Sequence, residues 1–140
     1  MKVYIDGGSR GNPGSSAVGF TVFDDKKKEV FRYGKNIGHC TNNFAEYMAL
    51  IEVLKYIYSH QFHDKNENSI VIYSDSELLV KQMNRDYKVK SKNIYPLYRK
   101  AQELVNGLNN IRIEHVKRED NRIADWIVNR VLDGESFELA

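Results

Sequence analysis

The 140-residue chain has few of the features that form disulfides, link domains or insert into a membrane. It has one cysteine, Cys40, so an internal disulfide is impossible and a reducing compartment is the simplest expectation. It has two prolines and no linker rich in Pro, Gly or Ser, so we expect one domain over residues 1–140. No apolar run approaches the roughly 20 residues of a membrane helix, and the N-terminus has no secretion-signal pattern. We therefore expect a cytoplasmic monomer without a membrane partner.

An excess of one charge sign is also missing, because 21 Lys and Arg stand against 19 Asp and Glu. This net charge of +2 is too mild to indicate nucleic acid by itself. Residues 81–100, however, contain seven basic side chains and one acid, with three tyrosines interleaved. Such a stretch suits a phosphate backbone, and the alternative is a solvated helical face.

Hydrophobic periodicity predicts an α/β protein. The predicted strands cover residues 2–6, 17–23, 30–37, 69–74 and 111–117. The predicted helices cover residues 42–60, 76–85, 95–108 and 120–132, the last one capped by Asp120. The glycine-rich segment 7–16 and the polar segment 63–68 are predicted loops, and 24–27 is a predicted hairpin turn. Three sequential strands followed by helix-separated strands predict a mixed sheet with helices on its faces.

Two acids follow apolar strands directly. Asp6 comes after the apolar residues 3–5, and Asp75 comes after the dense apolar run 70–73. In open α/β sheets, ligands bind in the crevice beyond the carboxyl ends of the strands. If these two strands are parallel neighbours, the two carboxylates meet there.

Glu46 breaks the pattern of its own helix. On a helical wheel it shares the apolar stripe of Leu50 and Val53, so its carboxylate is aimed at the sheet. A lone ionised carboxylate in that position costs several kcal/mol unless it is paired or binds a metal. Asp125 lies on the shoulder of the apolar face of the last helix, and the wheel leaves its direction open.

Inward-facing acids without enough inward-facing cations indicate a metal site. Oxygen ligands favour Mg²⁺ or Mn²⁺ over zinc, and paired divalent ions are a common device for phosphodiester hydrolysis. The alternative for each acid is a helix cap or a surface salt bridge. That alternative is weakest for Glu46, because no basic residue shares its stripe.

Four motifs occur in an order that resembles the type 1 ribonuclease H family over essentially the whole chain. They are DGGSRGNPG at 6–14, TNNFAEY at 41–47, YSDS at 73–76 and VKREDNRIAD at 116–125. The resemblance implies a ribonuclease H-like fold, with a five-stranded mixed sheet in the order 3-2-1-4-5. It implies hydrolysis of the RNA strand of RNA–DNA hybrids, leaving 5′-phosphate and 3′-hydroxyl ends. It also implies a site for two Mg²⁺ or Mn²⁺ ions, held by the carboxylates of Asp6, Glu46, Asp75 and Asp125.

The resemblance further implies contacts with the hybrid from the remaining motif residues. These substrate-binding candidates are Gly7, Gly8, Arg10, Asn12, Thr41, Asn42, Asn43, Ser76 and Gln82. The free N–H groups at the start of a helix suit a phosphate, which fits residues 41–43. The alternative for these three residues is a helix cap alone.

The sequence departs from many family members in two places. The loop at 117–120 is short and has no histidine, and Arg118 is the best-placed substitute for contacting the scissile phosphate. The alternative is a surface cation paired with Glu119 or Asp120. His115 is expected to be packed within its strand rather than catalytic. A long basic insertion between Asp75 and residue 111 is also absent, which predicts modest affinity for the hybrid and a steep salt dependence.

Two other functions remain open at this point. One is a non-catalytic module that binds hybrid or double-stranded RNA on the same fold. The other is a related metal nuclease that also cuts double-stranded RNA.

Overall fold

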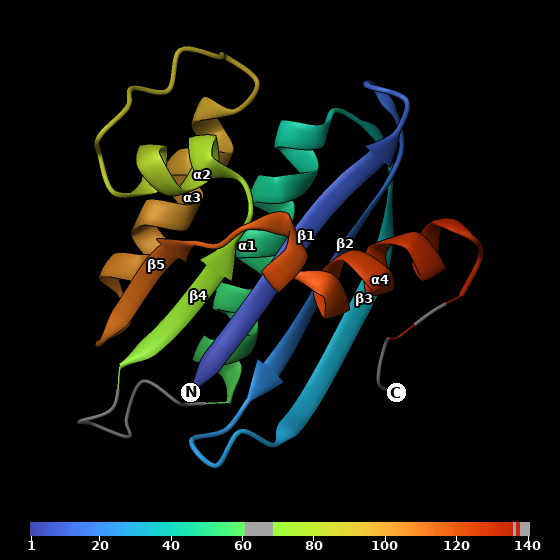
Figure 1. Ribbon diagram of the computed structural model, residues 1–140. Helices are drawn as coiled ribbons and strands as arrows, with labels where there is room; N and C mark the ends of the chain where they lie inside the picture. Colours follow the sequence, from blue (N-terminus) through green and yellow to red (C-terminus); the bar gives the residue numbers. More distant parts are fainter. Residues whose placement is uncertain (61–68, 136, 138–140) are drawn as a thin grey trace.

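The computed structural model describes residues 1–60, 69–135 and 137, and the loop predicted at 63–68 lies outside this part of the chain. Figure 1 shows a twisted sheet flanked by helices. In chain order the elements are β1 (Lys2–Arg10), β2 (Gly14–Phe23), β3 (Glu29–Cys40), α1 (Asn42–Ser59), β4 (Ile70–Ser74), α2 (Glu77–Met83), α3 (Tyr95–Asn106), β5 (Ile111–His115), the 3₁₀ turn η2 (Arg118–Asp120) and α4 (Arg122–Leu132).

The five strands form one mixed sheet in the order β3-β2-β1-β4-β5. β1 pairs with β2 and β2 with β3 in antiparallel fashion, whereas β1–β4 and β4–β5 are parallel. The predicted fold class and strand order are therefore confirmed. In the parallel register Ile5 lies opposite Ser74, so the next residues, Asp6 and Asp75, emerge side by side at one edge.

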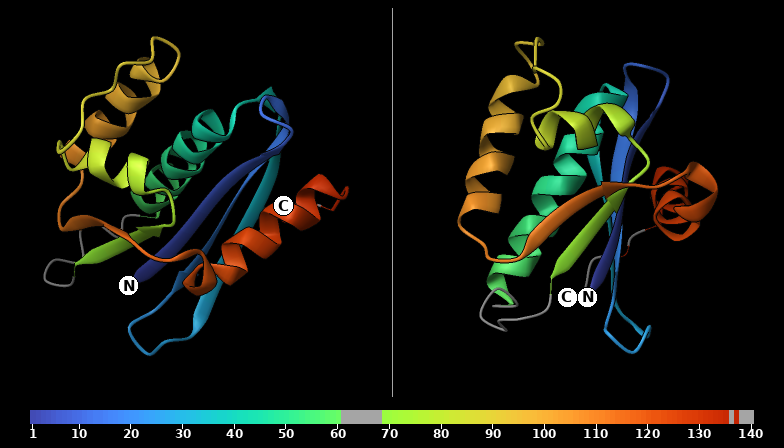
Figure 2. Two further views of the ribbon diagram at one scale, coloured as in Figure 1. Left: turned by 45° about the horizontal axis from the view of Figure 1, so that its top comes forward. Right: turned by 60° about the vertical axis from the view of Figure 1, so that its left-hand side comes forward.

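The two faces of the sheet are covered unequally. In Figure 2, α1, α2 and α3 lie on one face, and α4 lies alone on the other. The larger core joins the first face to its helices and contains Leu50, Leu54 and Ile72, all fully buried. A smaller cluster of Ala17, Ile127, Val128 and Val131 attaches α4. None of the helices in the described residues has the length and apolar character that a membrane crossing requires.

The prediction that 7–16 forms one loop is wrong. β1 continues to Arg10 and β2 begins at Gly14, so only residues 11–13 form the turn. The glycine at position 7 serves close packing instead of a turn, because a Cβ there would fall well inside van der Waals contact with the Ala45 carbonyl oxygen of α1. Glycine content was therefore a poor guide to local conformation here.

The expected cap of the last helix also needs correction. α4 begins after Asn121, and Asp120 belongs to the 3₁₀ turn that precedes it. The predicted hairpin at 24–27 is confirmed, since the Lys27 N–H donates to the Asp24 carbonyl oxygen at 3.0 Å. The prediction that His115 is packed within a strand over 111–117 is wrong, because β5 ends at His115 and the side chain is exposed.

Candidate functional site

Three carboxylates from three elements converge at one edge of the sheet. Asp6, Glu46 and Asp75 each offer an oxygen, and these oxygens all lie within 4.8 Å of one another. Asp6 lies within β1, at the first position beyond its pairing with β4, and Asp75 directly follows β4. The wheel prediction for Glu46 is confirmed, because its side chain points from α1 toward the sheet and is 8% exposed.

The backbone of β1 holds Glu46 in place. The Gly7 N–H donates a hydrogen bond of 2.6 Å to Oε1 of Glu46. This bond is possible because Gly7 has no side chain, which allows the Ala45–Glu46 segment of α1 to lie directly against β1. The Glu46 carboxylate is thus held by a backbone donor of β1, in addition to its side-chain hydrogen bond with Asp6.

Burial and mutual repulsion change the acidity of this group. Burial is the main cause that raises the pKa of Asp6 to about 8, and the negative charges of Asp75 and Asp125 act in the same direction. Burial also raises the pKa of Glu46 well above its ordinary value, with further contributions from Asp6 and Asp75. The Gly7 N–H opposes both shifts. Three close carboxylate oxygens, two of them from buried acids with raised pKa values, fit a hard divalent cation.

Asp125 and Arg118 lie at the same pocket but outside the close group of three acids. The pocket has a volume of about 390 Å³, and both side chains line it together with the three clustered acids. Among the described residues, the close group of oxygens does not include Asp125, whose side chain is exposed. None of the ion pairs in the described part of the chain joins Arg118 to Glu119 or Asp120.

Most of the expected substrate-binding residues form the walls of this pocket. Those that line it are Gly7, Gly8, Arg10, Asn42, Asn43 and Ser76. Arg10 reaches toward α4, where its guanidinium lies 2.7 Å from the carboxylate of Asp133. The predicted start of the helix at residue 42 is confirmed, because Thr41 caps α1 by accepting a hydrogen bond from the Phe44 N–H.

Three of the expected substrate-binding residues lie outside the pocket lining. Thr41 is occupied by its capping bond, and the Asn12 side chain accepts a 3.0 Å hydrogen bond from the Asn42 N–H. Gln82 is 7% exposed, and its Oε1 accepts a 2.8 Å hydrogen bond from the Tyr47 hydroxyl. Gln82 therefore belongs to the interior between α1 and α2 and does not face the pocket.

Sequence analysis overlooked other polar residues of the site. Ser9 and Asn129 line the pocket, and the Asn121 amide contacts Asp75. Helical spacing could have identified Asn129, because it lies four residues after Asp125 on the same helix. Asn121 had a similar signal, since it lies four residues before Asp125.

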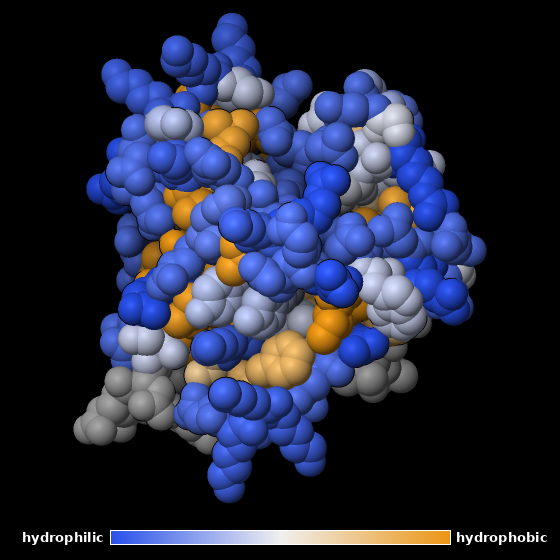
Figure 3. Space-filling view, in the orientation of Figure 1, coloured by the Kyte–Doolittle hydropathy of each residue, from blue (hydrophilic) through white to orange (hydrophobic). Residues whose placement is uncertain are grey.

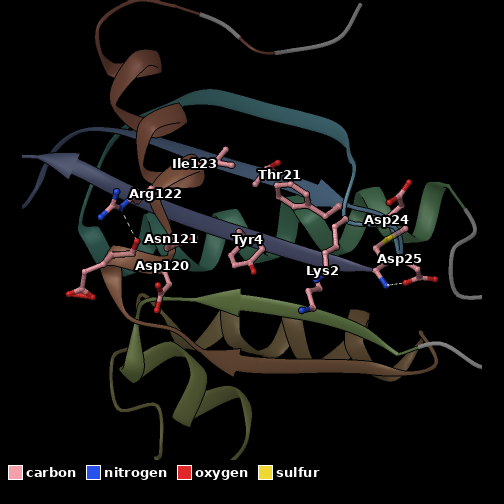
Figure 4. Close-up of a pocket in the computed structure, with 13 residues that line it drawn as sticks. Lys2, Tyr4, Thr21, Asp24, Asp25, Asp120, Asn121, Arg122 and Ile123 are labelled. Carbon is pink, nitrogen blue, oxygen red and sulfur yellow. Dashed lines mark hydrogen bonds and ion pairs between the residues drawn. The ribbon is translucent and has the colours of Figure 1, made fainter.

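A larger hollow lies on the α4 face but contains none of the four acids. It has a volume of about 650 Å³ and is lined by residues that include Lys2, Tyr4, Thr21, Asp24 and Arg122 (Figure 4). Figure 3 shows that hydrophilic side chains dominate this face, with apolar ones in separate patches. Size alone would select this hollow, but its lining mixes both charge signs and lacks a convergent set of carboxylates.

Comparison with known proteins places this geometry in a family. The family model described as "Reverse transcriptase-like" matches residues 4–131. The chain is 37% identical over 133 residues to "Ribonuclease HI" of Halobacterium salinarum, covering 95% of this chain and 64% of that protein. It is 38% identical over 143 residues to "Bifunctional protein Rv2228c" of Mycobacterium tuberculosis, covering 100% of this chain and 38% of that protein. The chain thus spans less than two thirds of the length of either relative.

A solved structure agrees with these relatives. The crystal structure of LC11-RNase H1, an enzyme isolated from compost, contains a bound RNA/DNA hybrid. It superimposes with a TM-score of 0.87 at 36% identity, covering 94% of this chain and 96% of that one. The chain therefore belongs to the reverse-transcriptase-like family and, within it, to the type 1 ribonucleases H.

Proposed function

We propose that this protein is a divalent-metal-dependent endonuclease that hydrolyses the RNA strand of RNA–DNA hybrids. The observation that carries the proposal is the convergence of Asp6, Glu46 and Asp75 within 4.8 Å, in a pocket that Asp125 also lines. A pocket that only bound nucleic acid would not gain from buried acids, because they repel phosphates. The hybrid bound to LC11-RNase H1 supports the choice of substrate.

The four acids would hold two Mg²⁺ or Mn²⁺ ions. When bound, such ions lower the pKa of water and stabilise the charge that develops on a leaving oxygen. Asp6 and Asp75 lie just beyond the paired part of β1 and β4, where they would bind the ions from the sheet. Glu46 would hold one ion and accept a hydrogen bond from the RNA 2′-hydroxyl, the group that distinguishes RNA from DNA. Asp125 would bind the second ion from the solvent side.

The remaining lining residues would bind and orient the duplex. Arg118 is exposed and lines the pocket, so its guanidinium would contact the scissile phosphate. Asn42 and Asn43 lie in the first turn of α1 and line the pocket, where the positive end of the helix dipole and their side-chain amides would favour a phosphate of the DNA strand. The products would carry 5′-phosphate and 3′-hydroxyl ends. We propose that residues 1–140 form a single domain that acts as a cytoplasmic monomer without an obligate protein partner.

A cleavage assay tests the proposal against both alternatives. Labelled RNA–DNA hybrid, double-stranded RNA and double-stranded DNA are incubated with the protein and Mg²⁺ or Mn²⁺. We expect cleavage of the hybrid's RNA strand alone, its loss in Asp6→Asn, and its retention in Glu52→Gln. Glu52 is the matched control for acid substitutions because it lies on α1 outside the pocket.

Two results would replace the proposal. Binding of the hybrid without cleavage in either metal would indicate the non-catalytic module. Equal cleavage of hybrid and double-stranded RNA would indicate the broader metal nuclease.

A further inference from the structure

One buried amide contacts the segments that carry three of the four acids. Asn121 follows the 3₁₀ turn η2 and immediately precedes α4, and it is 1% exposed. Figure 4 shows it where the chain enters α4. Its side chain therefore lies in the interior, although the turn before it lies on the surface.

The Asn121 side chain donates in two directions. Its Nδ2 lies 2.8 Å from the Ile5 carbonyl oxygen, which belongs to the peptide group that leads into Asp6. The same nitrogen lies 3.2 Å from Oδ2 of Asp75. One amide group thus joins the end of the β1–β4 pairing to the carboxylate that follows β4.

The backbone of Asn121 makes the third connection. Its carbonyl oxygen accepts a 3.2 Å hydrogen bond from the Asp125 N–H, in the first turn of α4. Because Asp125 stands on that first turn, its position depends on where Asn121 is held. The contacts of a single residue therefore relate Asp6, Asp75 and Asp125 to one another.

The unpaired oxygen of the amide supports a functional reason for this orientation. Oδ1 of Asn121 is the one buried side-chain polar atom in the described residues that has no hydrogen-bond partner. Rotating the amide by half a turn would aim this oxygen at a carbonyl and a carboxylate, and both would repel it. A buried unpaired oxygen costs stability, so an apolar residue would be the less costly choice if Asn121 only filled space.

We propose that Asn121 is a positioning residue, whose amide orients the Asp75 carboxylate and keeps β1, β4 and α4 in register for cation binding. The proposal rests on the proposed function, since it concerns the same cluster. A hydrogen bond to Oδ2 fixes the rotation of the carboxylate and leaves its other oxygen available to a cation. Partners of this kind change metal affinity by about 10- to 100-fold when they are removed.

The first test measures Mn²⁺ binding by calorimetry without nucleic acid, at a temperature where circular dichroism shows each variant to be folded. Asn121→Ala and Asn121→Ser are expected to weaken Mn²⁺ binding by about 10- to 100-fold. Their hybrid cleavage should recover when Mn²⁺ is raised in proportion, because the ligands themselves are intact. Asn84→Ala is the matched control, since Asn84 also donates to a strand carbonyl, that of Ile113 at 3.1 Å, but lies away from the acids.

The second test needs no variant and so does not depend on their folding. In a Mg²⁺ titration followed by NMR, the side-chain amide signals of Asn121 are expected to shift with the same midpoint as the Asp75 backbone signal. The Asn84 side-chain signals should stay in place. Unmoved Asn121 signals, or variants that bind Mn²⁺ like the wild type, would overturn the proposal.

The outcomes separate this proposal from the proposed function. If the wild type cleaves hybrid but Asn121→Ala binds Mn²⁺ normally, the positioning role is wrong and the function stands. If Asn121→Ala weakens Mn²⁺ binding in a protein that never cleaves hybrid, the positioning role stands and the function is wrong.

Discussion

The two helices that carry acids to the pocket are held on the sheet in different ways. α1 lies on the large core, and its Glu46 is 8% exposed, whereas α4 lies on a four-residue cluster and its Asp125 is exposed. α1 rests on the sheet through backbone, where Ala45 meets Gly7. α4 packs mainly through side chains, since a Cβ on Gly34 would lie 2.5 Å from Cγ2 of Ile127, and its closest backbone approach is looser, with the Ala124 carbonyl oxygen 3.2 Å from a Cβ on Gly19.

Glu46 and Asp125 therefore differ in how firmly they are held. Backbone atoms cannot move without shifting a whole element, whereas a packed side chain can change rotamer at lower cost. We infer that Glu46 is held by the core packing of its helix, whereas the position of Asp125 depends on a smaller apolar cluster and on the contacts of Asn121.

The largest expected effect comes from removing the two charges separately. Glu46→Gln should lower hybrid cleavage by more than about 100-fold. Loss of a residue that only hydrogen-bonds to a metal ligand costs about 10- to 100-fold, and the loss of a ligand should exceed this. Asp125→Asn should keep measurable activity, with a loss of about 10- to 100-fold, because its carboxylate lies outside the close group. Initial rates at several Mn²⁺ concentrations measure both effects.

Glu52→Gln accompanies this pair as the control on α1. Equal losses of cleavage rate in the Glu46 and Asp125 variants would show that the buried acid and the exposed acid contribute alike.

Glycine-to-alanine substitutions compare how tightly α1 and α4 pack against the sheet. Gly7→Ala should lower the free energy of unfolding by about 3 kcal/mol, because the added methyl meets backbone. Gly34→Ala should cost about 1 kcal/mol, because Ile127 can shift and alanine is favoured over glycine in a strand. Urea denaturation followed by circular dichroism measures the differences.

Gly8→Ala provides the reference for this series. A Cβ there would meet nothing nearer than Cγ1 of Val128 at 3.7 Å, so its stability should stay within about 0.5 kcal/mol of the wild type. A Gly34→Ala variant less stable than Gly7→Ala would reverse the comparison.

The pH dependence of stability should come from the two buried acids, Asp6 of β1 and Glu46 of α1, because both pKa values are raised. The folded-state pKa of Asp6 is raised to about 8, so the folded protein keeps a proton that the unfolded chain loses near its ordinary pKa of 3.8. This contribution to stability is complete below the unfolded pKa and is lost as pH rises through the folded pKa. The melting temperature of the metal-free protein should therefore fall between about pH 5 and pH 8.5.

Asp6→Asn should flatten that slope, and saturating Mn²⁺ should restore stability at pH 8.5 in the wild type. Differential scanning fluorimetry in EDTA and in Mn²⁺ measures both effects. A melting temperature that rises steadily with pH in EDTA would contradict the raised pKa.

The smallest expected effect concerns the surface contact of α4 with β1. Asp133→Asn removes the ion pair with Arg10, and both side chains are about half exposed. Such pairs contribute about 0–1 kcal/mol, so the change in unfolding free energy should be below about 1 kcal/mol and should vanish in 1 M salt. A larger loss would show that α4 depends on this pair more than on its apolar cluster.

The sequence predicted the features that depend on local pattern. It did not predict those that depend on contacts between segments far apart in the chain. Periodicity located the elements, and the stripe shared with Leu50 showed that Glu46 points inward. The segment 7–16 was misinterpreted because a glycine needed for close packing looks the same as a glycine needed for a turn. The direction of the Asp125 side chain could not be predicted, because the packing position of α4 depends on residues distant in the chain, such as Ala17.

A buried acid that holds its proton up to about pH 8 competes with cations for the same oxygens. Each cation that enters must expel protons to solvent, so filling the pocket should acidify an unbuffered solution. For this acid, low pH favours the protonated, metal-free site and keeps cations out, whereas higher pH frees the oxygens for cations and destabilises the metal-free site. The pH that best suits the empty pocket is therefore lower than the pH that best suits the filled one.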